Sequence, residues 1–188
     1  MSIDDVIAQR VVQLRTAQRL SLAQLAERSG VSKAMISRIE RQDSSPTAAV
    51  LGRLAAGLGV SLTDLLDDAS APETPALRKK AEQAVWRDPA TGYVRRQVAQ
   101  LDPASASELI EIELPAGAQV DYPQWHSKPH RQRLWILDGE LELIYGESQH
   151  NMVAGDQLDF SVDKPITYIA RTSCRYLLNI LHERNNVA

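Results

Sequence analysis

The chain is 188 residues long, enough for two small domains, and residues 1–66 form a mildly basic part with 8 lysines and arginines against 6 acids. Residues 67–188 carry 13 lysines and arginines against 18 acids, and the whole chain has a net charge of -3. Only the first part is therefore suited to face phosphates. A single cysteine, Cys174, excludes an internal disulfide framework, and the lack of a signal-like or membrane-spanning apolar run predicts a cytoplasmic protein without membrane contact.

The first predicted helix covers residues 4–18, because Ile7, Val11 and Leu14 recur at helical spacing. Further on, Thr47 is the expected cap of a helix that runs through Gly57. A capping-box-like start at 61–64 opens a last short helix through residue 66. These helices flank the segment that carries the strongest functional signal.

Residues 20–41 have the pattern of a helix-turn-helix. Ser21 and Gln24 form a capping box at the start of a short helix, and Gly30 stands where the chain must reverse. Ser32 caps a second helix, whose apolar residues leave one polar face uncovered. That face consists of Lys33, Ala34, Ser37 and Arg38. A positioning helix, a tight turn and a helix with a free polar face suit the DNA major groove, although a surface hairpin with solvated charges is an alternative.

Residues 67–82 are polar, contain two prolines and predict a linker with a short helical piece near 76–84. Short alternating runs between turn signals then predict an all-β domain over residues 83–188. The expected strands are 84–87, 93–98, 108–114, 118–122, 132–138, 140–146, 149–153, 157–160, 166–171 and 174–181.

The helical block resembles the five-helix, lambda-repressor-like DNA-binding domain of the XRE (phage-repressor-like) regulators over residues 6–66. The residues that carry the resemblance are Leu25, Ala26, Gly30, Val31, Ile36, Ile39, Glu40, the run Ser45-Pro46-Thr47 and residues 54–61. The resemblance implies base contacts from Lys33, Ala34, Ser37 and Arg38. It implies phosphate contacts from Arg19, Ser21, Leu22, Ser32, Arg41, Ser44, Ser45 and Thr47. One such domain covers a half-site, so a dimer on a palindromic operator in double-stranded DNA is expected.

The second part resembles the cupin family of jelly-roll barrels over residues 106–181. The matches are Gly117, Gly139, Glu140, Gly155, Asp156, Phe160 and Pro165. The chain as a whole therefore resembles a known type of bacterial regulator with two domains, an all-α DNA-binding domain (1–66) and an all-β cupin barrel (83–188), joined by the linker 67–82. This resemblance implies a transcriptional regulator, a repressor by family default, that forms a homodimer through its cupin domain.

Metal-dependent cupins use three histidines and a glutamate as ligands, and the corresponding positions here hold His126, Lys128, Gln132 and Ile166. Lysine is cationic at neutral pH and isoleucine has no donor atom, so no metal or other cofactor is expected. A site made from His126 and His130 remains an alternative, although Pro129 disfavours the helix that would align them. The corresponding alternative function is a metal-dependent cupin enzyme with an accessory DNA-binding domain.

A barrel without metal can still bind a small-molecule effector, whose identity the sequence does not reveal. The aromatic residues expected around such a pocket are Tyr122, Trp125, Trp135, Tyr145 and Tyr168. His126, Lys128 and Arg133 complete the expected lining, and the two cations suit an anionic ligand. Core packing is the alternative role for each aromatic residue, and a purely structural barrel is the alternative for the domain. The linker is the expected route between effector and DNA.

Overall fold

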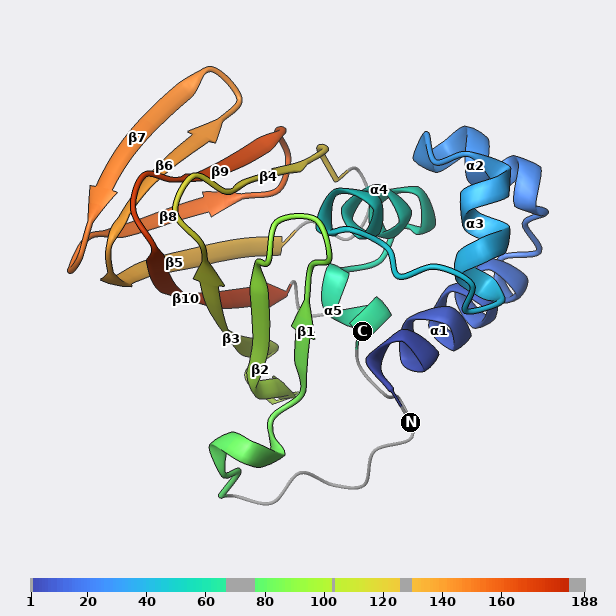
Figure 1. The fold of residues 1–188 in the computed structure, drawn as a ribbon, viewed down its shortest axis with the longest axis horizontal. Coiled ribbons are helices and arrows are strands. Elements are labelled where there is room, and N and C mark those ends of the chain that lie inside the picture. The colour runs from blue at the N-terminus through green and yellow to red at the C-terminus, as the bar shows by residue number, and fades with distance from the viewer. Residues whose placement is uncertain (1, 67–76, 103, 126–129, 183–188) are drawn as a thin grey trace.

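The structure is a computed structural model that describes residues 2–66, 77–102, 104–125 and 130–182. We refer to residues 2–66 as the helical domain and to residues 77–182 as the β-domain (Figure 1). The helices are α1 (Ile3–Ala17), α2 (Leu22–Ser29), α3 (Lys33–Glu40), α4 (Ala48–Leu58), α5 (Leu62–Leu66) and the 3₁₀ helix η1 (Lys80–Glu82). The strands are β1 (Val85–Arg87), β2 (Val94–Asp102), β3 (Ser107–Leu114), β4 (Gln119–Tyr122), β5 (His130–Asp138), β6 (Glu140–Tyr145), β7 (Ser148–Val153), β8 (Gln157–Ser161), β9 (Ile166–Ala170) and β10 (Cys174–His182).

A hydroxyl side chain caps the start of every α-helix in the helical domain. The Oγ atoms of Ser2, Ser21 and Ser32 accept backbone N–H groups three residues ahead, as do Thr47 and Ser61. Such caps satisfy amides that have no partner inside the helix. The predicted five-helix domain is confirmed, with α4 ending one residue later than expected.

The recognition helix of the predicted helix-turn-helix, α3, is tied to α1 by an ion pair between Arg15 and Glu40. The guanidinium Nε and Nη2 atoms lie 2.6 and 2.8 Å from the two carboxylate oxygens, and Nη1 donates to the Leu20 carbonyl at 2.8 Å. The hydrogen bond to Glu40 raises the pKa of Arg15. This planar, two-pronged contact fixes the direction of α3 relative to α1.

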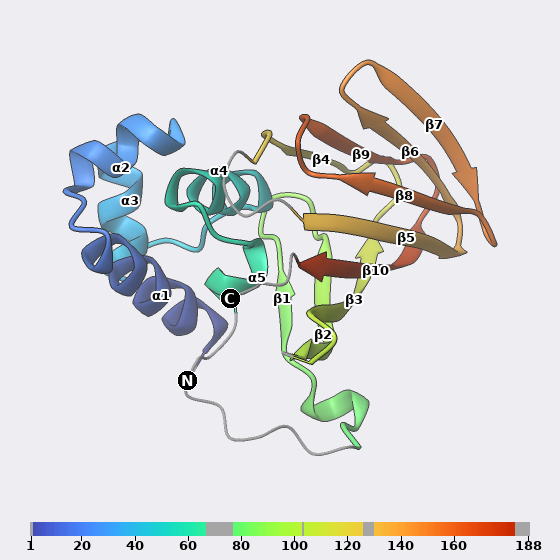
Figure 2. The same cartoon turned by 180° about the vertical axis from the view of Figure 1, so that it is seen from behind.

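The β-domain is a sandwich of two antiparallel sheets (Figure 2). One sheet has the order β1-β2-β3-β10-β5-β8, and the other has the order β4-β9-β6-β7. All ten expected strands are present, with ends that differ from the prediction by a few residues. The earlier start of β5 has a clear cause, because His130 pairs with His182 at the end of β10. The predicted all-β domain is confirmed, as a sandwich of two antiparallel sheets.

The turn between β5 and β6 shows why a glycine stands at a position shared with the cupins. Gly139 has a φ of 79°, in the left-handed region that favours glycine. A Cβ atom at this position would lie 2.1 Å from the carbonyl oxygen of Ser173. The chain therefore needs glycine here for both conformation and space.

The helical domain and the β-domain pack directly against each other. One continuous apolar core contains buried residues of both, and α4 and α5 lie beside the sandwich in both views (Figures 1 and 2). Trp125 Nε1 donates to the carbonyl of Val60 at 3.2 Å, and Arg95 Nη2 donates to Thr63 Oγ1 at 2.5 Å. The expected linker lies mostly outside the described residues. Direct contact is thus a physical connection between the domains.

Gly52→Ala tests the closeness of this contact. A Cβ atom on Gly52 would lie 2.3 Å from Cδ1 of Tyr122, so the tyrosine ring would have to move. We expect the substitution to lower the free energy of unfolding by about 1–3 kcal/mol, the usual cost of overpacking, as measured by urea denaturation. In a Tyr122→Ala background the same substitution is expected to cost much less. Equal costs in both backgrounds would show that the ring is not the obstacle.

Candidate nucleic-acid interface and pocket

Three of the four residues predicted to contact bases are exposed on α3. Lys33, Ala34 and Arg38 are exposed, while Ser37 is half-buried. Neither Lys33 nor Arg38 has a side-chain hydrogen bond or ion pair with any described residue. Their charged ends are therefore available to a nucleic acid.

Ser37 and Arg41 are engaged with each other in the structure. Arg41 Nη1 donates to Ser37 Oγ at 2.6 Å, and Arg41 Nε pairs with Asp43 at 2.9 Å. This exposed ion pair is weak in water, so a phosphate can replace Asp43 as the partner of Arg41. Ser37 Oγ is the acceptor in this bond, so its own proton is still available to a base.

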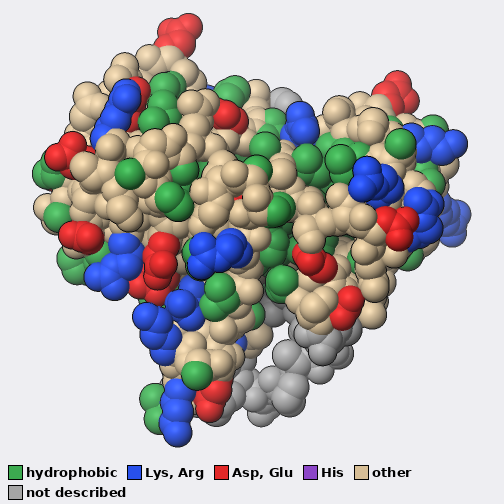
Figure 3. All heavy atoms as spheres, viewed as in Figure 1, with side chains coloured by type: hydrophobic (Ala, Val, Ile, Leu, Met, Phe, Trp, Pro, Cys, Tyr) green, Lys and Arg blue, Asp and Glu red, His purple; other side chains and the backbone are tan. Residues whose placement is uncertain are grey.

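The residues predicted to contact phosphates lie at helix ends and in loops. Arg19 follows α1 with a φ of 56° and is exposed, and Leu22 is the first residue of α2. Ser21, Ser32 and Thr47 cap α2, α3 and α4, so the backbone N–H groups at those helix starts stand beside them. Figure 3 shows lysine and arginine side chains gathered on the helical domain around the end where α2 lies.

The loop between α3 and α4 offers less to a phosphate than the resemblance implied. Ser45 Oγ donates to Asp4 Oδ2 at 2.6 Å, so its proton is directed to a carboxylate. A negative charge beside this hydroxyl disfavours a phosphate at the same place. Ser44, its neighbour, is half-buried.

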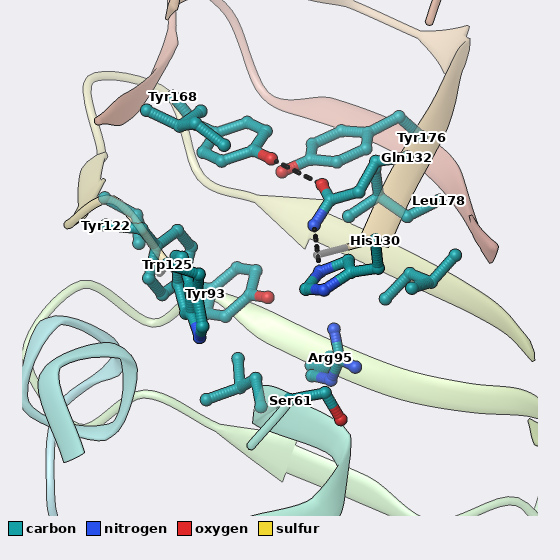
Figure 4. Close-up of a pocket in the computed structure, with 14 residues that line it drawn as sticks. Ser61, Tyr93, Arg95, Tyr122, Trp125, His130, Gln132, Tyr168, Tyr176 and Leu178 are labelled. Atoms are coloured by element: carbon teal, nitrogen blue, oxygen red, sulfur yellow. Dashed lines mark hydrogen bonds between the residues drawn. The ribbon is translucent and has the colours of Figure 1, made fainter. Parts of the chain in front are cut away.

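A pocket lies inside the β-domain where it meets α5 (Figure 4). Its cavity volume is about 40 Å³. The helical domain contributes Ser61 and Leu62, and the β-domain supplies the rest. The β-domain residues are Tyr93, Arg95, Val120, Tyr122, Trp125, His130, Gln132, Ile166, Tyr168, Tyr176, Leu178 and Ile180. The pocket is therefore formed jointly by the two domains.

One wall of the pocket is a hydrogen-bonded chain of polar side chains. Tyr168 OH donates to Gln132 Oε1 at 3.1 Å, and Gln132 Nε2 lies 3.3 Å from His130 Nε2. The His130 ring stacks on that of His182 with a centroid distance of 5.7 Å. These contacts fix the orientation of His130 and Gln132 toward the cavity (Figure 4).

Four tyrosines in the pocket keep their protons at neutral pH. Burial raises the pKa of Tyr93, Tyr122, Tyr168 and Tyr176 above the ordinary value. The hydroxyl of Tyr122 is enclosed and has no partner with hydrogen-bond geometry, although the nearby hydroxyl of Tyr93 contributes to the shift of its pKa. The pocket thus presents neutral hydroxyl donors.

Comparison with known proteins identifies the family. Residues 11–65 match the helix-turn-helix family HTH_3. The chain is 31% identical over 159 residues to the HTH-type transcriptional regulator SutR of Escherichia coli (strain K12), across 85% of this chain and 83% of SutR. The chain belongs to the XRE (HTH_3) family of helix-turn-helix transcriptional regulators.

Other helix-turn-helix regulators agree with this assignment. The structure of an HTH_3 family transcriptional regulator from Vibrio cholerae superposes with a TM-score of 0.79 at 27% identity, covering 97% of this chain and 98% of that one. SinR of Bacillus subtilis (strain 168), another HTH-type transcriptional regulator, is 33% identical over 93 residues, which are 49% of this chain and 84% of SinR. No described helix of this XRE-family chain has the length and apolar character needed to cross a membrane.

The predicted pocket lining of this XRE-family chain needs correction. Tyr122, Trp125 and Tyr168 do line the cavity. Arg133 and Trp135 do not, because alternate residues of β5 point outward: the Arg133 side chain pairs with Asp159 at 2.9 Å, and Trp135 is 50% exposed.

Tyr145 is also outside the cavity, at the end of β6. Its hydroxyl donates to Asp163, and burial together with that carboxylate raises its pKa to about 12. His126 and Lys128, the other two expected lining residues, lie outside the described residues.

The residues present do not fit the metal site of metal-dependent cupins. Gln132 is bonded to Tyr168 and His130, and Ile166 is a buried wall residue without a donor atom. Within the described ranges, no three His, Cys, Asp or Glu side chains come together as a metal site. The first member of the alternative pair His126 and His130 falls outside those ranges.

Behind His182 lies a buried carboxylate, Glu108, whose ionisation is linked to stability. Burial raises its pKa, but His182 at 2.9 Å, Arg95, Gln97 and Thr63 together lower it below the ordinary value. A lowered pKa in the folded state contributes stability that is present above the unfolded pKa, about 4.3, and is lost as pH falls through the folded value.

Glu108→Gln is therefore expected to flatten the acid limb of the stability curve. In the parent chain, the urea midpoint should fall as pH drops below about 4, and in Glu108→Gln this fall should be smaller. Glu147→Gln, at an exposed position, is the control and should leave the curve unchanged. An identical acid limb in the parent and in Glu108→Gln would contradict the linkage.

Proposed function

We propose that this regulator binds a palindromic operator as a homodimer formed by its β-domain, and that its pocket binds a small-molecule effector without a metal or other cofactor. Repression, including of its own promoter, is the expected mode, and the cytoplasm is the expected place of action. The single observation that carries the effector proposal is the joint lining of the pocket, because Ser61 and Leu62 belong to the DNA-binding domain. A ligand there touches both domains at once.

This arrangement gives an effector a means to change DNA affinity. A ligand shifts an equilibrium only by the difference in its affinity for the two states. Here the cavity wall includes the start of α5, so a change in how α5 sits against the β-domain changes the contacts that a ligand makes. The position of the two recognition helices in a dimer would change with it.

The outer face of the six-stranded sheet is the proposed dimer surface. Trp135 is 50% exposed on this face and lies opposite Leu177 of β10. Exposed tryptophan is a common centre of protein interfaces. Charges of both signs, including the pair Arg133 and Asp159, surround it and suit a self-complementary two-fold contact.

The experiment that tests the DNA-binding part is selection from a random duplex pool with the full chain, followed by native mass spectrometry of the selected complex. We expect an inverted repeat, with half-site centres about one helical turn (roughly 34–36 Å) apart or a multiple of it, bound by two chains. One chain on a single half-site would overturn the dimer proposal.

The effector part is tested by adding fractions of a cellular small-molecule extract to the operator complex and following fluorescence anisotropy. A fraction that shifts operator affinity supports the sensor. If no fraction does so, the β-domain is a structural dimerisation unit instead.

A further inference from the structure

We propose that the effector is a small carboxylate whose negative group is held by Arg95 at the junction of the β-domain and α5. This inference rests on the proposed sensing function and specifies the chemical class of its ligand.

Arg95 is a buried cation whose charge Glu108 offsets only in part. The residue is 4% exposed, and its Nε atom has no hydrogen-bond partner. Its hydrogen bond at Nη2 goes to the neutral hydroxyl of Thr63. Among the described residues Arg95 forms no ion pair. A buried guanidinium that has no anion bound directly at its N–H groups is costly, which favours an anionic ligand in the adjacent cavity.

Glu108, the carboxylate that interacts electrostatically with Arg95, is hydrogen-bonded to other residues. Its two oxygens accept from His182 Nε2 at 2.9 Å and Gln97 Nε2 at 3.0 Å. Thr63, which stands between the two groups, also contributes to its lowered pKa. Glu108 therefore offsets part of the charge of Arg95 without occupying its N–H donors.

The guanidinium is placed to meet a ligand. In Figure 4 it lies between Ser61 and the ring of His130, and the Tyr93 hydroxyl points into the same space. A carboxylate is planar and matches the fork of a guanidinium with two parallel hydrogen bonds. Neutral tyrosine hydroxyls can donate further bonds to it.

The rest of the cavity suits an apolar body of modest size. The rings of Tyr122 and Trp125 are 5.8 Å apart, and Tyr168 packs against Tyr122 at 6.1 Å. The volume of about 40 Å³ holds roughly three waters. A larger ligand must displace side chains of the wall, and Leu62 of the DNA-binding domain is one of them. Binding is thereby coupled to the position of α5.

The test uses the full chain and matched pairs of acids and amides. Acetate, butyrate, benzoate and 4-hydroxybenzoate are each titrated beside the corresponding amide by calorimetry, with inorganic phosphate as a further probe. We expect at least one acid to bind, and its amide to bind about tenfold more weakly or worse, because the charge-assisted bonds to Arg95 are lost. Binding of no acid, equal binding of acid and amide, or binding of phosphate alone would overturn the proposal.

Three variants assign the binding to Arg95. Arg95→Gln should weaken binding of the acid by about tenfold or more, and Arg95→Lys should bind it with an affinity between those of Arg95→Gln and the parent chain. Arg96→Gln is the control, since Arg96 is the next residue on β2 and pairs with Glu111. Undiminished acid binding by Arg95→Gln would overturn the assignment. If that variant does not fold, the acid and amide pair on the parent chain and the Arg95→Lys variant still decide the question.

Failure of this inference can be separated from failure of the proposed function. Acid binding is measured without DNA, and operator affinity is then measured with and without the acid. If an acid binds through Arg95 but does not change operator affinity, the carboxylate site is supported and the sensing function is refuted. If a neutral or cationic cellular effector changes operator affinity, the sensing function is supported and the carboxylate proposal is refuted.

Discussion

Arg38→Ala is expected to abolish the preference of the full chain for its operator while leaving the fold intact. Arg38 is exposed on α3 and contacts no described side chain through a hydrogen bond or ion pair, so its removal leaves no buried group without a partner. A bidentate contact between arginine and guanine is worth about 1–3 kcal/mol. A dimer loses it twice, so operator affinity should fall by roughly 30-fold or more.

Fluorescence anisotropy with the selected operator and a scrambled duplex at one salt concentration measures this effect. Lys164→Ala removes one positive charge from an exposed position between β8 and β9 and is the control. It should retain the preference. If Arg38→Ala still distinguished operator from scrambled DNA as the parent chain does, Arg38 would not be the base-reading residue.

Trp135→Arg is expected to convert the dimer to a monomer and to weaken operator binding by about 10²–10⁴-fold, because the second half-site no longer binds as part of one molecule. The substitution would place two like charges close to the two-fold axis of the proposed interface. Sedimentation velocity gives the oligomeric state, and anisotropy gives the affinity. The helical domain alone is a poor substitute for this variant, because its α4 and α5 are packed against the β-domain.

Val153→Arg is the control for that experiment. Val153 is 52% exposed on β7, which belongs to the four-stranded sheet. Both substitutions replace an exposed apolar side chain with arginine, but on different sheets. It should remain a dimer. A dimeric Trp135→Arg together with a monomeric Val153→Arg would move the interface to the four-stranded sheet.

The sequence predicted the elements well because their signals are local. Helix starts depend on a hydroxyl and an amide three residues apart, and the turn at Gly139 depends on a few neighbouring atoms. The same locality explains the success with the strands, where alternation and turn residues lie within short windows.

The pocket was predicted less well, and part of the failure was avoidable. Strand alternation in β5 places His130 and Gln132 inward and Arg133 and Trp135 outward, and that alternation is legible in the apolar positions 134 and 136. The chemical types of Arg133 and Trp135 suggest ligand contacts, but their positions along the strand place both side chains outside. Chemistry alone therefore selected an arginine and a tryptophan that face solvent.

Local sequence patterns could not have predicted the part of the pocket lined by Tyr93, Arg95 and the DNA-binding domain. Residues 83–105 resemble no part of the cupin core, so nothing marked Tyr93 and Arg95 as lining a cavity. The contact from Arg95 to Thr63 joins residues 32 apart in the sequence and depends on how two domains meet. Only the three-dimensional arrangement shows that the DNA-binding domain helps to form the pocket.

The continuous apolar core has a consequence for the genetics of this regulator. Because buried residues of the helices and of the sandwich belong to one cluster, the two domains should unfold as a single cooperative unit. A substitution at Leu134 or Ile136, deep in the sandwich, would then lower the fraction of chains able to occupy an operator in the cell. Alleles that lose regulation should accordingly map to the interior of the β-domain as often as to the helix that reads DNA.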